Sequence, residues 1–263
     1  MYRTMAVLAL ATVGVAAGWG AAAGQRVAAS ESQPEPILVE LFTSEGCSSC
    51  PPADALLGRM AGKTMPSGRP IITISEHVTY WNHDGWMDPF SSDAVTERQQ
   101  EYVDHLHVDG GPYTPQMVIE GTAQVAGSDE VALDHALQQA DQSKTGVALS
   151  IGPVDANKDS MEVHFQLSGD TGKAHKVQVT VFVTDDDDQV HVKAGENADR
   201  TLTHVSVARS MNHVDLHGGA LSGTIRVRLP SKPPVGGDTG RHLIVVAQQD
   251  GQGQVLAVAT RSM

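Results

Sequence analysis

The residues best suited to do chemistry are two cysteines, the only two in the chain, which stand three positions apart as Cys47-Ser48-Ser49-Cys50. A β-branched run precedes them and a helical pattern follows, so we expect the pair at a strand-to-helix junction. The unpaired N–H groups and positive dipole end of such a helix lower the pKa of the first thiol. The pattern predicts thiol–disulfide exchange, in which Cys47 attacks as an exposed thiolate and Cys50 resolves the mixed disulfide.

Other chemistries remain open for this pair. A structural disulfide over so short a loop contributes only about 2 kcal/mol by chain-entropy arithmetic. A structural zinc site normally needs four Cys or His ligands, and the sequence has no second Cys pair. A softer metal such as copper could instead be held by both thiolates together with His77 and His83. The exchange interpretation needs no dissociable cofactor.

Three residues outside the pair are candidates to assist it. Glu40 lies in an otherwise apolar run just before the cysteines, where a buried carboxylate could accept a proton from Cys50 as a general base. A partly exposed or hydrogen-bonded Glu40 is the alternative. Thr114-Pro115 stands just before a strand-like run, where a cis peptide bond could expose backbone groups of Thr114 to an extended substrate.

Residues 75–90 are expected to form a polar loop that holds two of the three tryptophans, Trp81 and Trp86, together with His77 and His83. This loop could border the site and offer the two tryptophans to a substrate. It could also supply the two histidines as metal ligands. In the third interpretation the aromatic rings only cover the core.

The elements that must position these residues follow from the hydrophobic periodicity. Apolar residues at i, i+3, i+4 and i+7 predict a helix after Cys50, and two further helices are expected after the capping residues near 91–93 and 128–130. Strand-like runs lie between them. The resulting order, β-α-β-α-β-β-α, predicts a thioredoxin-like α/β fold with the cysteines at its first strand-to-helix junction. The expected strands are 37–42, 71–74, 116–120 and 124–126.

The pattern changes after Gly146 to short β-like runs without helices between them. We therefore expect an antiparallel β-rich unit at 145–263 that follows the thioredoxin-like unit at 36–144. The run Asp185 to Asp188 lacks the spaced ligands of a calcium loop and is expected to be a solvated turn. The expected strands are 147–154, 161–168, 175–184, 223–229, 241–248 and a last one near 254–260.

Composition and the N-terminus bear on location and partners. The formal net charge of −13 argues against nucleic acid or an anionic membrane as a partner. Residues 1–30 have the basic start, apolar stretch and small residues of a signal peptide, and 31–36 form a lead-in. No later segment is apolar enough to span a bilayer. We therefore expect a periplasmic or secreted protein that acts on an exported protein or a small thiol or disulfide. The oligomeric state is not predicted.

Four blocks of the chain carry a family resemblance. They are the run VELFTSEGCSSCPPAD at 39–54 and residues 75–92, 113–118 and 195–204. With them the chain resembles the exported bacterial family named "domain of unknown function 1223", in the thioredoxin-like superfamily. The resemblance implies a thioredoxin-like fold with a C-terminal β-rich extension, and it brings no assigned reaction.

The wider similarity to thioredoxins is looser. Cys47, Cys50 and Pro115 fall where a thioredoxin has its two active cysteines and its cis-proline. Glu40 is one residue farther from the pair than the buried acid of thioredoxins, and Gly46 replaces the usual aromatic residue. These departures leave room for a non-catalytic member, either a copper-type carrier or a scaffold that docks partners on its β-rich unit.

Overall fold

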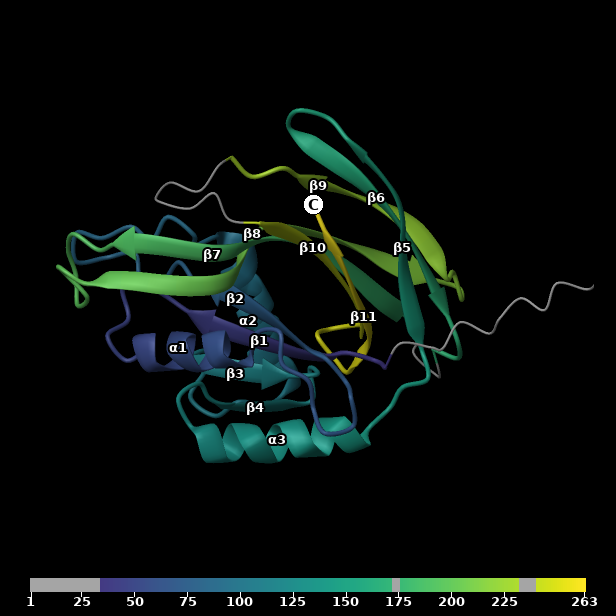
Figure 1. The fold of residues 1–263 in the computed structure, drawn as a ribbon, viewed down its shortest axis with the longest axis horizontal. Coiled ribbons are helices and arrows are strands. Elements are labelled where there is room, and N and C mark those ends of the chain that lie inside the picture. Colours follow the sequence, from purple (N-terminus) through teal and green to yellow (C-terminus); the bar gives the residue numbers. More distant parts are fainter. Residues whose placement is uncertain (1–33, 172–175, 232–239) are drawn as a thin grey trace, which may run out of the picture. The chain divides into compact units, whose positions relative to one another are not determined.

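Strands alternate with helices in the first part of the computed structural model, which describes residues 34–171, 176–231 and 240–263. The predicted signal peptide at 1–30 lies outside these residues. Strands β1 and β2 are parallel and joined through α1, whereas β3 is antiparallel to β1 and carries β4 on its other edge (Figure 1). The order β1-α1-β2-α2-β3-β4-α3 is the thioredoxin-like fold that the sequence predicts. The bounds are β1 Ile37–Thr43, α1 Pro51–Met60, β2 Ile71–His77, α2 Asp93–His105, β3 Gln116–Ile119, β4 Ala123–Ala126 and α3 Glu130–Gln142.

The second part consists of strands in antiparallel pairs, as expected. Three of them form a sheet in the order β5-β6-β9. The other four extend the main sheet, whose order is β11-β10-β7-β8-β2-β1-β3-β4. The bounds are β5 Ala148–Ala156, β6 Ser160–Ser168, β7 Lys176–His191, β8 Thr201–His217, β9 Ser222–Arg228, β10 Arg241–Gln249 and β11 Val255–Ser262.

One narrow junction joins the two parts of the main sheet. β8 pairs with β2 in parallel at a single register position, Ser75 with Val207. Contacts across the sheet make Pro34–Met263 one compact unit. The division into units at 36–144 and 145–263 therefore stays a prediction.

Three local expectations were wrong. Asp185 to Asp188 do not form a solvated turn but continue β7, with Asp185 and Asp188 buried. Asp185 can be buried because Arg209 and Arg241 both donate to its carboxylate. The expected strands omitted β8 altogether. The expected loop at 75–90 begins too early, because β2 continues to His77.

β1 is buried along its whole length, and its two faces pack against different partners. Val39 and Leu41 join the core formed with α1 and α3. Leu38 and Phe42 contact other clusters, and that of Phe42 includes residues of α2. Alternate side chains of a strand point to opposite faces, so Val39 and Leu41 lie on the α1 and α3 side of the sheet and Leu38 and Phe42 on the other.

Helix α1 shows why the cysteines stand where they do. Cys50 is its N-cap residue, and Pro51 and Pro52 occupy the first turn, where their missing N–H groups cost least. The helix buries the predicted face, Ala53, Leu56, Leu57 and Met60, against β1 and α3.

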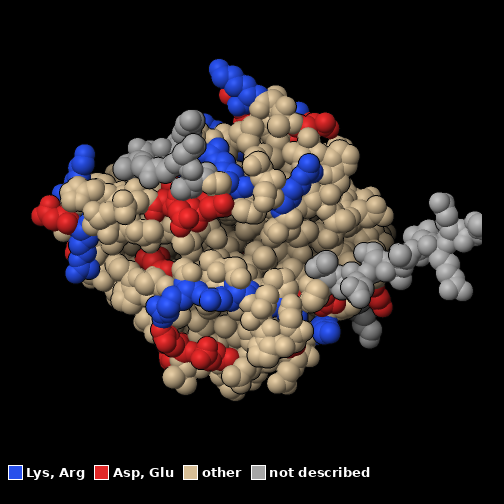
Figure 2. Space-filling view, in the orientation of Figure 1, with Lys and Arg blue, Asp and Glu red and all other residues tan. Residues whose placement is uncertain are grey.

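Charged side chains of both signs lie on one face of the molecule. On the face drawn in Figure 2, Lys and Arg side chains lie next to Asp and Glu side chains rather than in one field. Among the described residues, no helix combines the length and the hydropathy that crossing a bilayer requires.

Candidate functional site

Cys47 and Cys50 form a disulfide in the turn between β1 and α1, with their Cα atoms 5.4 Å apart. The carbonyl of Cys50 accepts hydrogen bonds from the backbone N–H groups of Ala53 and Asp54, at 2.8 and 3.1 Å. The pair thus lies near the start of α1, as the sequence predicts. Both cysteines are fully buried, however, and Cys47 does not have the exposure that was expected of an attacking thiol.

The connection between β7 and β8 is bonded to the cysteine loop. The side-chain amide of Asn197 donates to the carbonyls of Glu45 and Cys47, at 2.9 Å each. Asn197 is itself fully buried, and Arg200 donates to its side-chain oxygen at 3.0 Å. The neighbouring Glu196 carboxylate accepts from the backbone N–H of Ser48 at 3.0 Å, and this bonding lowers the pKa of Glu196. The C-terminal part of the chain therefore holds both sides of the cysteine turn.

The predicted cis bond is present between Thr114 and Pro115. Trp81 links this bond to the cysteine turn, because its indole N–H donates to the Thr114 hydroxyl at 2.7 Å while its backbone oxygen lies against Gly46. A Cβ at position 46 would be 2.7 Å from that oxygen, so no larger residue fits. This contact explains why glycine precedes Cys47.

The other candidate residues of the predicted loop, Trp86, His77 and His83, do not converge on one site. Trp86 donates from its indole N–H to Oε2 of Glu45 at 2.8 Å, so it fixes a carboxylate beside the cysteines. His77 is fully buried, and its Nδ1 lies 2.7 Å from Asp88. His83 has a side chain that is 52% exposed and pairs with Asp84. In residues 34–171, 176–231 and 240–263, no group of three or more His, Cys, Asp or Glu has the geometry of a metal site.

The structure separates Glu40 from the cysteine pair. Its carboxylate accepts from Nε of Arg98 at 2.8 Å and from the Tyr102 hydroxyl at 2.5 Å, and both partners belong to α2. Val39 and Leu41 face α1, so alternation turns Glu40 toward the opposite layer. The single-residue offset from the thioredoxin position therefore moves the carboxylate across the sheet. It is not placed to accept a proton from Cys50.

Sequence reasoning missed a buried polar cluster on the cysteine side of the sheet. Nε2 of His204 in β8 lies 3.7 Å from Glu45, and its Nδ1 lies 3.7 Å from Asp54. Burial lowers the pKa of His204, but the two carboxylates outweigh it and raise the value to about 10. The Thr43 hydroxyl orients Asp54 from 2.9 Å. The alternation of Leu202 and His204 with the polar Thr201 and Thr203 was the signal that could have revealed the strand and His204 in it.

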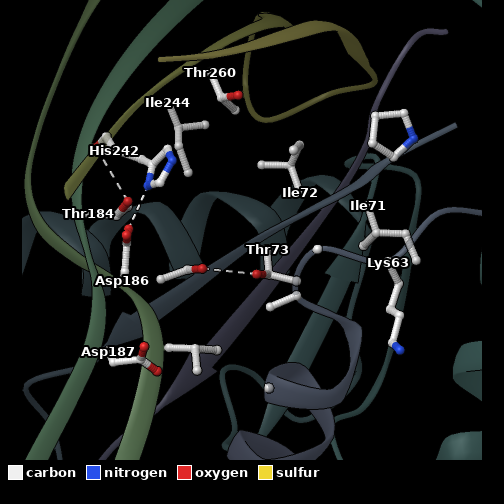
Figure 3. Close-up of a pocket in the computed structure, with 16 residues that line it drawn as sticks. Lys63, Ile71, Ile72, Thr73, Thr184, Asp186, Asp187, His242, Ile244 and Thr260 are labelled. Carbon is white, nitrogen blue, oxygen red and sulfur yellow. Dashed lines mark hydrogen bonds and ion pairs between the residues drawn. The ribbon is translucent and has the colours of Figure 1, made fainter. Parts of the chain in front are cut away.

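A cavity of about 470 Å³ lies elsewhere, between the C-terminal end of α1 and the place where β2 and β8 diverge. Figure 3 shows Thr184, Asp186 and His242 on one side and Ile71, Ile72 and Thr73 on the other. His242 pairs with Asp186 at 2.5 Å, and Thr73 bonds Ser206 at 3.0 Å. None of the predicted site residues lines this cavity.

Comparisons with known proteins agree with this fold. The family model described as "Protein of unknown function (DUF1223)" matches residues 38–248. Protein AGR_C_4864 from Agrobacterium tumefaciens is similar in structure, with a TM-score of 0.59 and 26% identity over 86% of this chain and 94% of that chain. HBP35 of Porphyromonas gingivalis has a TM-score of 0.62 at 13% identity, over 88% of this chain and 76% of that one, and shares the fold alone. No curated protein matches the chain.

Proposed function

From the premise that this chain belongs to the family described as "Protein of unknown function (DUF1223)", we propose that it is an extracytoplasmic thiol–disulfide oxidoreductase. The observation that supports this most directly is the Cys47–Cys50 disulfide beside the first turn of α1 in a thioredoxin-like fold, with the cis bond before Pro115. The proposed location is the periplasm or the exterior of the cell. The proposed partner is an exported protein or a small thiol or disulfide.

In the exchange, the thiolate of reduced Cys47 attacks one sulfur of a partner disulfide, and the other partner sulfur leaves as a thiolate and takes up a proton. The Cys50 thiol loses its proton and attacks the sulfur of Cys47, so the pair closes and the partner's second sulfur is released. Two electrons pass from the pair to the partner. In the reverse direction the pair accepts two electrons from a partner dithiol. The positive end of the α1 dipole stabilises the thiolate. Direct N–H donation has no part in this, because Pro51 and Pro52 have no N–H and the N–H groups of Ala53 and Asp54 donate to the Cys50 carbonyl.

The full burial of both cysteines sets a condition on this chemistry. A partner sulfur must approach Cys47 along the S–S axis, so residues around the cysteine turn have to move before exchange. Asn197 is the residue to test, because its side chain bonds the carbonyls on both sides of Gly46. Exchange in this proposal therefore follows a local opening of the turn.

A redox titration tests the proposal. The chain without its predicted signal peptide, residues 31–263, is equilibrated in glutathione buffers and its free thiols are trapped. We expect a reversible two-electron transition with a midpoint between about −120 and −270 mV, the range of exchange proteins. A disulfide that stays closed below about −300 mV would show a structural bond and overturn the proposal.

The same burial favours a second candidate, a scaffold in which the disulfide only fixes the turn before α1. In that case the protein binds a partner without chemistry. Replacing both cysteines by serine distinguishes the two functions. The scaffold keeps its biological role in the double variant, whereas the oxidoreductase loses it.

A further inference from the structure

His204 occupies a position that packing alone does not explain. Its side chain is fully buried, and its two ring nitrogens lie 3.7 Å from Glu45 and from Asp54. These carboxylates bracket the redox pair in sequence, two residues before Cys47 and four residues after Cys50. Hydrogen bonds link the backbone of both residues to that of the cysteines. The side-chain amide of Asn197 bonds the carbonyls of Glu45 and Cys47, and the N–H of Asp54 donates to the carbonyl of Cys50.

Neither ring nitrogen of His204 has a hydrogen bond, and Oε1 of Glu45 has none either. A residue kept for stability alone would be better replaced by an apolar one, because a buried ion pair of poor geometry often costs more in desolvation than it returns. The charge of the imidazolium is therefore the property to explain.

The groups packed against His204 define its electrostatic surroundings. The ring of His77 meets it edge-on, with centroids 4.7 Å apart, and His77 is itself paired with Asp88. Asp188 approaches from β7, and both oxygens of its buried carboxylate lack a hydrogen bond. Asp185, in the same strand as Asp188, pairs with Arg209, which is in the same strand as His204. Glu45 and Asp54 are thus the carboxylates that face the two nitrogens of His204.

Carboxylates on the residues that flank the cysteine turn oppose ionisation of a thiol there, because like charges raise the free energy of a thiolate. A cation between them reverses much of that effect at the low dielectric of a buried site. We propose that His204 is a positioning residue for exchange, whose imidazolium holds Glu45 and Asp54 on either side of the cysteine turn and offsets their charge when a thiolate forms there. His204 keeps its proton throughout and makes no bond to a substrate. This inference rests on the proposed function of the pair.

The test is the thiol pKa of the reduced protein, measured from the pH dependence of alkylation by iodoacetamide. We expect His204→Gln to raise the pKa of the more reactive thiol by about one unit, which slows alkylation at pH 7 about tenfold. Asp54→Asn alone should act in the opposite direction and speed alkylation. The double variant should return toward the wild-type rate, because the charge and its counter-charge are both removed. His213→Gln, a change at an exposed histidine of the same strand, is the matched control.

The outcomes separate this inference from the proposed function. If the wild-type pair titrates in the exchange range but His204→Gln leaves the thiol pKa unchanged, His204 has only a structural role. If His204→Gln does not fold, Asp54→Asn decides the question, and an unchanged or higher thiol pKa in that variant overturns the inference. A pair that resists reduction below about −300 mV instead removes the proposed function itself.

Discussion

Two buried cations lie on opposite faces of the sheet, and they are bonded very differently. Arg98 in α2 uses all three side-chain nitrogens, donating to Glu40, to Gln252 at 2.6 Å and to the Tyr102 hydroxyl at 3.1 Å. His204 in β8 lies 3.7 Å from each of its carboxylates and has no hydrogen bond.

This difference in hydrogen bonding distinguishes two kinds of site. We call the Arg98 cluster the closed site and the cluster of His204, Glu45 and Asp54 the adjustable site. The Arg98 cluster is closed at its cation, because all three side-chain nitrogens donate hydrogen bonds. Both oxygens of the adjacent buried Glu76 have no hydrogen bond, and burial and Glu40 raise the pKa of this group well above its usual value. At His204 the cation itself has no hydrogen bond, and neither has Oε1 of Glu45, so the positions of these two groups can change at little cost in hydrogen bonds. The cysteines lie beside the adjustable site.

The largest expected effect comes from removing the cation of the closed site. Arg98→Met leaves Glu40 buried without its ion pair, so we expect the free energy of unfolding in urea to fall by about 3–5 kcal/mol. The thiol pKa of the molecules that remain folded should not change. Arg59→Met is the control, because Arg59 pairs with Glu130 at the exposed surface and its loss should cost no more than about 1 kcal/mol. A change in thiol pKa in Arg98→Met would abolish the distinction between the two sites.

Glu120 gives an independent test of what a buried ion pair without a hydrogen bond does to stability. Its cation, Arg69, lies 3.7 Å away and donates mainly to backbone carbonyls. Burial raises the pKa of Glu120 to about 7, against the effects of the Leu38 N–H and Arg69. The folded protein then holds a proton that the unfolded chain releases above about pH 4.5. Its contribution to stability is complete below that pH and is lost as the pH rises through about 7.

We therefore expect the unfolding free energy of the wild type, relative to Glu120→Gln, to fall by up to about 3 kcal/mol between pH 4.5 and 8. Urea denaturation at both pH values measures the difference. Glu130→Gln, at an exposed carboxylate, should show no such dependence. A constant difference between wild type and Glu120→Gln would contradict the assignment.

The smallest expected effect tests how the adjustable site opens. Asn197→Ala removes the donor shared by the carbonyls of Glu45 and Cys47, and a buried carbonyl without a partner costs about 1–3 kcal/mol. The cysteine turn should open more often, so reduction by dithiothreitol should be about tenfold faster, since 1.4 kcal/mol corresponds to that factor. Asn157→Ala, at an exposed turn between β5 and β6, is the control. An unchanged rate would show that other residues limit access.

The elements around β1 and α1 were predictable because local patterns determine them. Apolar residues at helical spacing define the buried face of α1, and the prolines after Cys50 define its start. β8 was missed because half of its length alternates weakly and carries histidines and serines. Its burial depends on pairing with β7 and contact with β2, which no local pattern contains.

The candidate site was likewise predictable only where local sequence determines it. The spacing of Cys47 and Cys50 correctly predicted a cysteine pair at the start of α1, and Thr114-Pro115 correctly predicted a cis bond. The choice of Glu40 as proton acceptor failed because sequence distance from the pair does not show on which face of β1 a residue lies. His204 and Asn197 come from the far half of the chain, so only the folded structure brings them to the cysteine turn.

The single pairing of Ser75 with Val207 has a consequence for the order of assembly during synthesis. Residues up to α3 emerge well before β8, so the β2 edge at Ser75 is at first without its neighbour, and Ile72 and Ile74 are without the C-terminal side chains that pack on them. Unpaired apolar edges tend to recruit other chains. A nascent chain that is released or cut before β8 emerges is therefore prone to aggregate, and native contacts so distant in sequence favour slow folding of the whole.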